Sequence, residues 1–133
     1  AIEVMEAQGF QPTSFTIPWG GQTDDLVDAL FGHFEIVRGS GSLGGIQDVR
    51  YTADDGRLTN GARLDEGWWT ENQLDAALRR ADRNGSVLVL YAHRILEESD
   101  KSHVTPASLE TALALIDERG LPHLTLTELL EEP

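Results

Sequence analysis

The chain has 133 residues, of which 40% are hydrophobic and 25% charged, so it is long enough for one folded domain with a core, and its composition is neither that of a disordered chain nor that of a membrane protein. Its formal net charge of −13 argues against nucleic acid or an anionic membrane surface as a partner. The chain has no cysteine, which excludes disulfides, thiolate nucleophiles and Cys-based zinc sites.

The acidic bias and the first residues bear on the source of the chain. Lys101 is its only lysine, and an acidic, lysine-poor surface fits either a salt-loving source or ordinary acidity from a GC-rich genome. The first ten residues have no basic n-region and no apolar h-region, so they predict no signal peptide. Because Ala1 stands in place of Met, we expect a piece or a processed form of a longer protein, and the missing signal says little about that parent.

The first forty residues predict alternating helices and strands. A helix ends at Gly9, and a short strand follows over residues 13–17, with apolar side chains on one side. Thr23 is a favourable N-cap for a helix with an acidic first turn and apolar residues at helical spacing. A second strand is predicted over residues 33–39.

The middle of the chain predicts a long loop and then a helix. Residues 39–64 are rich in Gly, Ser, Asp and Asn and lack periodicity, so we predict a long irregular loop, with at most a short strand around residues 49–51. Beyond it, Thr70 and Gln73 give the capping box of an amphipathic helix that Gly85 closes.

The last third predicts a strand, a helix and a closing strand. VLVLYAHRI, residues 87–95, begins with five successive apolar residues, which predict a strand buried on both faces. Thr105 and Pro106 give the N-cap and the first position of the next helix, and residues 121–130 close as a short strand and a turn. The element order predicts a single α/β domain, with a partial (β/α) barrel-like or open, largely parallel sheet and flanking helices.

Two strand ends carry residues suited to a site, because ligands bind beyond the carboxyl ends of parallel strands. His93 is either a hydrogen-bonded structural residue or a general acid, since histidine titrates near neutrality. Arg94 fits an ion-pair partner of a nearby carboxylate better than a substrate clamp. At the other strand end, Trp19 lies on a loop constrained by Pro18 and Gly20, where it offers a stacking face for a sugar, although most tryptophans pack in cores.

Other polar and aromatic groups give weaker signals. Trp68 and Trp69 are adjacent, so one is expected in the core and the other half-exposed. Asp-Asp-Gly at residues 54–56 predicts a solvated turn rather than a metal loop. No aspartate follows an apolar strand as the phosphoacceptor of a response-regulator-like domain would. No metal-site spacing occurs among the histidines, which are His33, His93, His103 and His123.

Two segments in the right order carry a family resemblance. GFQPTSFTIPWGG, with the helix after it and the strand HFEIVRG, matches a pattern G-x-x-P-x-x-F-x-x-P-x-G followed by helix and strand. VLVLYAHRI, followed by VTPASLETALALIDERGLPHLTLTEL, matches an apolar strand that ends in histidine, then a helix and a final G-x-x-x-x-T-L-x-E-L. Both resemble the carboxyl-terminal half of the NodB-homology polysaccharide deacetylases, whose fold is a distorted β/α barrel. The resemblance covers most of the chain apart from residues 39–64.

The resemblance implies a hydrolase that removes N- or O-acetyl groups from polysaccharides. The family holds a divalent, zinc-like metal with one aspartate and two histidines, and it uses a second aspartate as base. Those motifs lie upstream of the Pro-x-Gly loop in the family, whereas only 17 residues precede Pro18 here. We therefore expect the metal in the complete parent domain and none in this chain.

Several site residues follow from the resemblance by position. His93 matches the family's general acid, and the loop 18–20 matches its groove wall, while Arg38 and Asp65 are expected near the site. The family's closing motif reads leucine-x-histidine followed by aspartate, whereas this chain has Tyr91 and Arg94 there, as in a divergent branch. That departure leaves the detailed role of His93 open. The expected substrate-binding residues are Pro18, Trp19, Gly20, Arg38, Asp65 and Arg94.

We therefore expect the carboxyl-terminal part of a deacetylase domain, which supplies the acid and part of a sugar groove and is inactive by itself. The alternative is a non-catalytic carbohydrate- or partner-binding α/β domain in which His93 is structural. The expected partners are a carbohydrate and the remainder of the domain. Half a barrel also leaves exposed sheet edges, so we expect either self-association or an edge covered by residues 39–64. Family resemblance fits an extracytoplasmic or cell-envelope location.

Overall fold

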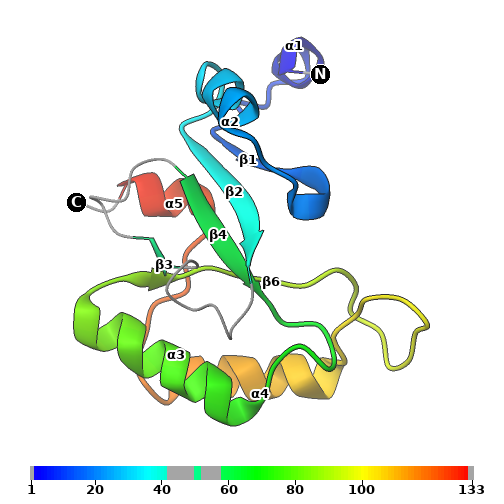
Figure 1. The fold of residues 1–133 in the computed structure, drawn as a ribbon, viewed down its shortest axis with the longest axis vertical. Helices are drawn as coiled ribbons and strands as arrows, with labels where there is room; N and C mark the ends of the chain where they lie inside the picture. Colours follow the sequence, from blue (N-terminus) through cyan, green and yellow to red (C-terminus); the bar gives the residue numbers. More distant parts are fainter. Residues whose placement is uncertain (1, 42–49, 52–57, 132–133) are drawn as a thin grey trace.

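A computed structural model, which describes residues 2–41, 50–51 and 58–131, is organised around one parallel sheet (Figure 1). A second, two-stranded sheet pairs its strands antiparallel. The parallel sheet curls into a half-barrel with flanking helices, which confirms the predicted partial α/β barrel-like class. The parallel strands, in spatial order, are β1 (Ser14–Thr16), β2 (Ile36–Gly41), β4 (Leu58–Arg63) and β6 (Leu90–Tyr91), and the antiparallel pair is β3 (Arg50–Tyr51) with β5 (Val87–Leu88).

The predicted helix starts are confirmed. The hydroxyls of Thr23, Thr70 and Thr105 accept backbone N–H groups three residues further on, at 3.1–3.3 Å, and each threonine has extended backbone angles. These bonds satisfy N–H groups that a helix start leaves unpaired. The helical segments of the described residues are α1 (Ile2–Ala7), η1 (Pro18–Gly20), α2 (Asp24–Phe31), α3 (Glu71–Asn84), α4 (Pro106–Asp117) and α5 (Leu126–Glu131).

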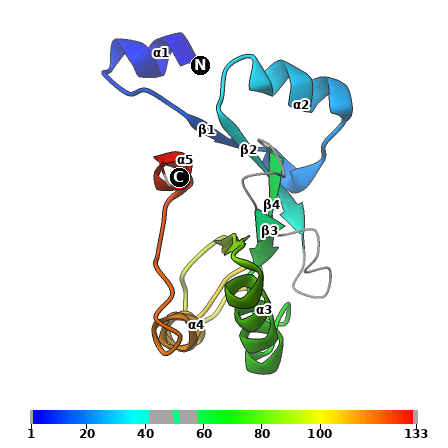
Figure 2. The same cartoon turned by 90° about the vertical axis from the view of Figure 1, so that its left-hand side faces the viewer.

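The outer face of the sheet carries the apolar core. Successive strand residues point to opposite faces, so Phe15, Val37 and Ala62 share the outer one. Helix α2 packs against the β1–β2 end of this face, and α3 and α4 pack side by side against its β4–β6 end (Figures 1 and 2). The buried residues are Ile17, Val27, Phe34 and Val37 in the first cluster and Ala62, Leu64, Leu74, Ala77, Leu78 and Ala112 in the second.

The inner face, which is the opposite side of the same strands, is polar. The strand register places Arg38, Arg63 and Tyr91 on it. Strand β4 separates β2 from β6, and two strand spacings make about 10 Å, yet the Arg38 guanidinium carbon lies 4.4 Å from the centroid of the Tyr91 ring. Gly61 lies between them, and a Cβ there would meet both side chains at 2.8 Å. Helix α5 lies beside the inner face, on the side of the sheet opposite to α2 (Figure 2).

The prediction of one irregular loop over residues 39–64 is wrong for its last part. Residues 58–63 form β4, a central strand of the parallel sheet, and residues 39–41 belong to β2. The sequence of β4, LTNGAR, lacks a clear apolar alternation because the polar Asn60 stands between Leu58 and Ala62 on the outer face. The short strand expected around residues 49–51 is β3, and the Asp-Asp-Gly turn lies outside the described residues.

Residues 87–95 are not one strand buried on both faces, as predicted, but two short strands in different sheets. Val89 is the buried residue of this segment, and Val87, Leu88, Leu90 and Tyr91 are only half-buried, so the segment is not enclosed on both faces. The predicted closing strand after α4 is also absent from the described residues: the chain runs without a strand to α5. Strands β1 and β6 are thus the two edges of the parallel sheet, and self-association through them stays a prediction.

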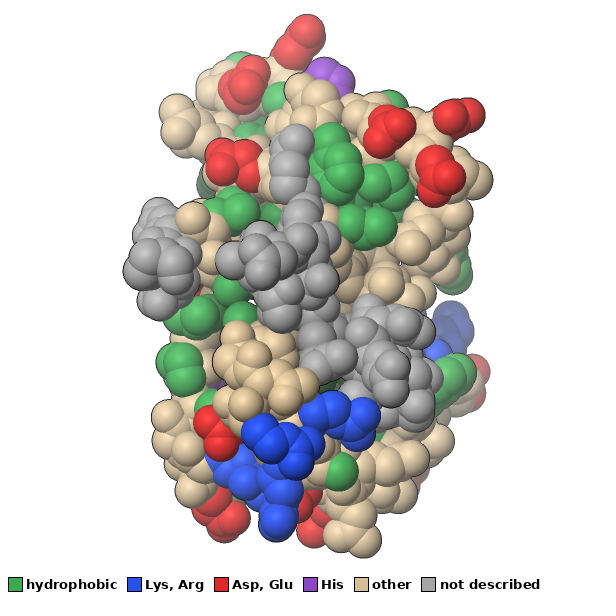
Figure 3. All heavy atoms as spheres, turned by 60° about the vertical axis from the view of Figure 1, so that its left-hand side comes forward, with side chains coloured by type: hydrophobic (Ala, Val, Ile, Leu, Met, Phe, Trp, Pro, Cys, Tyr) green, Lys and Arg blue, Asp and Glu red, His purple; other side chains and the backbone are tan. Residues whose placement is uncertain are grey.

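Charge is unevenly distributed over the surface (Figure 3). Acidic side chains lie at the end of the molecule formed by α1 and α2, while basic side chains gather at the opposite end, where α3 carries Arg79, Arg80 and Arg83. None of the described helices combines the length and the apolarity that a bilayer crossing requires.

Replacing Gly85 with alanine is expected to destabilise the protein by about 1 kcal/mol, because Gly85 ends α3 with a left-handed backbone (φ 59°) that disfavours a Cβ. No atom crowds the position, so the effect is backbone strain alone. The matched control is Gly21→Ala, at φ −74° and equally open space, which should leave the urea midpoint unchanged. Equal midpoints for both variants would contradict the strain argument.

Candidate functional site

A carboxylate and a histidine meet where β4 and β6 end. Asp65 lies two residues beyond β4 and His93 two residues beyond β6, so the paired parallel strands bring them together at their carboxyl ends. One Asp65 oxygen, Oδ1, accepts the backbone N–H of His93 at 3.1 Å. The other, Oδ2, lies 2.5 Å from His93 Nδ1. The two residues therefore form a pair joined by two hydrogen bonds. These bonds hold the loop after β6 against the end of β4.

Arg63 completes the surroundings of the Asp65 carboxylate. Its Nε donates to Oδ2 at 2.5 Å, and its side chain also donates to the Ser102 hydroxyl. The Arg63 guanidinium stacks on Trp68, 4.2 Å from the ring centroid. Residues 63 and 65 share the inner face because strand residues two apart point the same way. Arg63 thus compensates the buried charge of Asp65, which burial without a partner would disfavour.

The pKa of the Asp65 carboxyl is set by opposing causes. Asp65 is 1% exposed, and this loss of water alone would raise its pKa. The hydrogen bond from Arg63 and the two from His93 act in the other direction, and they outweigh burial, so the pKa lies below its ordinary value. Asp65 is therefore a carboxylate, and not a proton donor, at neutral pH.

An ionised Asp65 fixes the chemistry available to His93. A carboxylate only accepts hydrogen bonds, so Nδ1 of His93 carries the hydrogen between them, and Nε2 is the nitrogen left to exchange a proton with a ligand. The His93 side chain is 51% exposed, so a ligand can reach it. A carboxylate that orients an accessible imidazole is the arrangement of general acid–base catalysts.

The side chain of Tyr91 contacts both His93 and Arg38, so it links the Asp65–His93 pair to Arg38. The Tyr91 ring lies edge-on to the His93 ring, with 5.7 Å between centroids, and Arg38 packs over its face. The structure therefore brings together Arg38, Asp65 and His93, which the sequence singled out separately, on one inner face.

The loop 18–20 lies at the same end of the sheet but follows β1, the other edge strand. Trp19 is fully exposed there and has a left-handed backbone (φ 63°), which costs a non-glycine residue about 1–2 kcal/mol. Gly20 packs so closely on Ser40 at the end of β2 that a Cβ would collide with it. The loop thus presents a tryptophan to solvent at the expense of local strain.

Arg94 does not have the predicted role as the partner of the carboxylate. Its side chain is exposed, and within the described part of the chain no ion pair involves it. Arg63 occupies that role instead. The spacing of Arg63 and Asp65 at the end of a strand could have revealed it, but the strand itself was not predicted. Of the two adjacent tryptophans, Trp69 packs on the core and Trp68 is half-exposed, as predicted.

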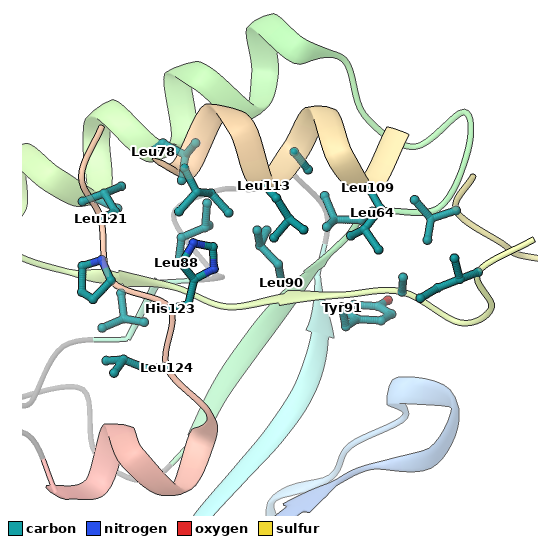
Figure 4. Close-up of a pocket in the computed structure, with 18 of the residues that line it drawn as sticks. Leu64, Leu78, Leu88, Leu90, Tyr91, Leu109, Leu113, Leu121, His123 and Leu124 are labelled. Atoms are coloured by element: carbon teal, nitrogen blue, oxygen red, sulfur yellow. The ribbon is translucent and has the colours of Figure 1, made fainter. Parts of the chain in front are cut away.

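A pocket of about 530 Å³ lies between the β5–β6 segment and helices α3 and α4. Figure 4 shows leucines filling its walls, with His123 toward one end and Tyr91 toward the other. His93 and Arg94 also line it, so the apolar pocket reaches the acid–base pair. Concave apolar pockets with a few convergent polar groups are the usual ligand sites of proteins.

The described residues do not fit a metal site. No three His, Asp or Glu side chains among them are grouped so as to hold a metal ion, and Asp65 already bonds Arg63 and His93. Searches against family models, curated proteins and solved structures found no match to the chain.

Proposed function

We propose that the chain is the acid-bearing part of a polysaccharide deacetylase-like hydrolase, which acts on N- or O-acetylated sugars once the remainder of its domain supplies the metal and the base. The observation that carries the proposal is the Asp65–His93 pair, held by two hydrogen bonds at the carboxyl ends of neighbouring parallel strands. The divalent metal would activate the attacking water in the complete domain.

In this role, His93 donates a proton to the departing amine or alcohol of the sugar. Asp65 holds the imidazole by Nδ1, so the proton leaves from Nε2, the nitrogen that faces away from the carboxylate. Arg63 keeps Asp65 ionised, and Trp68, which Arg63 stacks on, is half-exposed beside the pair. The exposed Trp19 provides an apolar face on the other side of the groove for a sugar ring.

Replacing His93 with glutamine should lower acetate release by about 10²–10⁴-fold, because general acid catalysis typically contributes that much. Acetate is measured enzymatically on N- and O-acetylated oligosaccharides with zinc present, for this chain and for the full gene product. We expect turnover only in the latter. The control is His33→Gln: His33 is exposed in the turn between α2 and β2, at the opposite end of the strands from the pair, so this variant should keep wild-type turnover.

The rival function is a non-catalytic carbohydrate-binding domain in which the pair only ties two loops together. Its signature would be wild-type acetate release in His93→Gln, or no release from the full gene product at all, with oligosaccharide binding retained in both cases. A thermal unfolding midpoint close to wild type shows that the His93→Gln result concerns chemistry and not folding.

A further inference from the structure

Among the described residues, Arg38 is a cation of the inner face without an acidic partner. Its Nε donates to the Thr16 hydroxyl at 3.2 Å, and Nη1 donates to the Gly39 carbonyl at 2.9 Å. Both acceptors are uncharged. Its remaining N–H groups, including both on Nη2, have no acceptor among the described residues. Two hydrogen bonds thus hold the guanidinium in place, and its other N–H groups remain able to donate to a ligand.

Three other arginines form ion pairs with aspartates among the described residues. Arg63 bonds Asp65, while Arg79 and Arg119 share Asp75. Arg38 is half-buried, and loss of water lowers the pKa of its guanidinium, an effect that the nearby Tyr91 hydroxyl opposes. A cation removed from water with no counter-charge is costly, and a bound anion relieves that cost.

A pocket of about 270 Å³ beside Arg38 indicates what kind of anion fits. It lies between α5 and the β5–β6 segment, and residues 87–90, 124–126 and Leu129 line it together with Arg38. Arg38 is the only charged residue among the described ones that line it. Thr125, its other polar residue, already accepts the N–H of Glu128. The described lining of the pocket therefore combines one basic residue with side chains that are otherwise mostly apolar.

We propose that this pocket binds a small monocarboxylate with an apolar chain, with the carboxylate on Arg38 and the chain between α5 and residues 87–90. Guanidinium and carboxylate match as paired donors and acceptors, and a single cation among apolar side chains suits a singly charged ligand with an apolar chain. The proposal goes beyond the deacetylase role and does not depend on His93, because the pocket lining does not include that residue.

Calorimetric titration of the chain with hexanoate tests the proposal. We expect a Kd of about 1 mM or tighter, as the usual affinity per ligand atom allows, and binding that tightens about three- to fourfold for each CH₂ from butyrate to hexanoate. Hexanol and glucuronate should bind at least tenfold more weakly, because the first lacks the charge and the second the apolar chain. Glucuronate that equals or exceeds hexanoate would show a sugar-acid site and overturn the proposal.

Arg38→Gln should weaken hexanoate binding at least tenfold, since a charge-assisted hydrogen bond is lost. Arg38→Lys keeps the charge but not the paired donors, so it should bind hexanoate with intermediate affinity. If Arg38→Gln does not fold, the affinity of Arg38→Lys tests the proposal instead. The control is Arg83→Gln on the exposed surface of α3, which should bind like wild type. Unchanged hexanoate affinity in folded Arg38 variants, or no binding to wild type, would reject the site.

Discussion

Replacing Asp65 with alanine is expected to lower the free energy of unfolding by about 3–5 kcal/mol, the cost typical of removing one partner from a buried ion pair. The carboxylate is 1% exposed, and it accepts bonds from the Arg63 side chain and from the backbone and ring of His93. Its loss leaves the partly buried Arg63 without its counter-charge. Urea unfolding followed by tryptophan fluorescence measures the change.

The matched control is Asp117→Ala. Asp117 also hydrogen-bonds a histidine, but its side chain is 70% exposed, so its removal should change stability by less than about 1 kcal/mol. Asp65→Asn keeps the shape and one accepting oxygen, so its cost should lie between those of the two alanine variants. A loss below about 1 kcal/mol in Asp65→Ala would mean that the pair contributes little to holding β4 and β6 together.

The sequence predicted the parts of the fold that have local causes. The threonine N-caps and the left-handed Gly85 were identified because capping depends on a few neighbouring residues. The alternating order of elements was sufficient for the fold class. Strand β4 was missed because Asn60 interrupts the apolar residues of its outer face, so the sequence shows no clear alternation.

The candidate site was predicted residue by residue but not as an arrangement. His93 was identified from its place after an apolar run, while Arg38 and Asp65 came only from the family resemblance. Their convergence depends on the register of β2, β4 and β6, which sequence spacing does not contain. The same gap explains why Arg94 was chosen over Arg63 as the partner of the carboxylate. The sequence shows that Arg94 follows His93 along the chain, but it does not show that Arg63 lies beside His93 across the sheet.

Stability should fall in acid through the titration of Asp65. Burial raises the pKa of this carboxyl, but the bonds from Arg63 and His93 lower it more, so the folded state has a pKa below the value of about 3.9 expected in the unfolded chain. Between the two values the unfolded state binds more protons, and stability rises with pH there. The contribution of Asp65 is thus complete above about pH 5 and decreases as the pH falls through the folded-state pKa.

Hydrogen bonds also lower the pKa values of Glu66, Asp75 and Glu128 in the folded state, so these carboxyls contribute to the acid response too. They respond equally in wild type and in Asp65→Asn, so the difference between the two proteins isolates the effect of Asp65. The difference in unfolding free energy between wild type and Asp65→Asn should shrink steadily as the pH falls below about 4. Urea midpoints measured in steps of pH give this difference. A gap that stays constant down to pH 2 would mean that ionisation of Asp65 is not what joins the ends of β4 and β6.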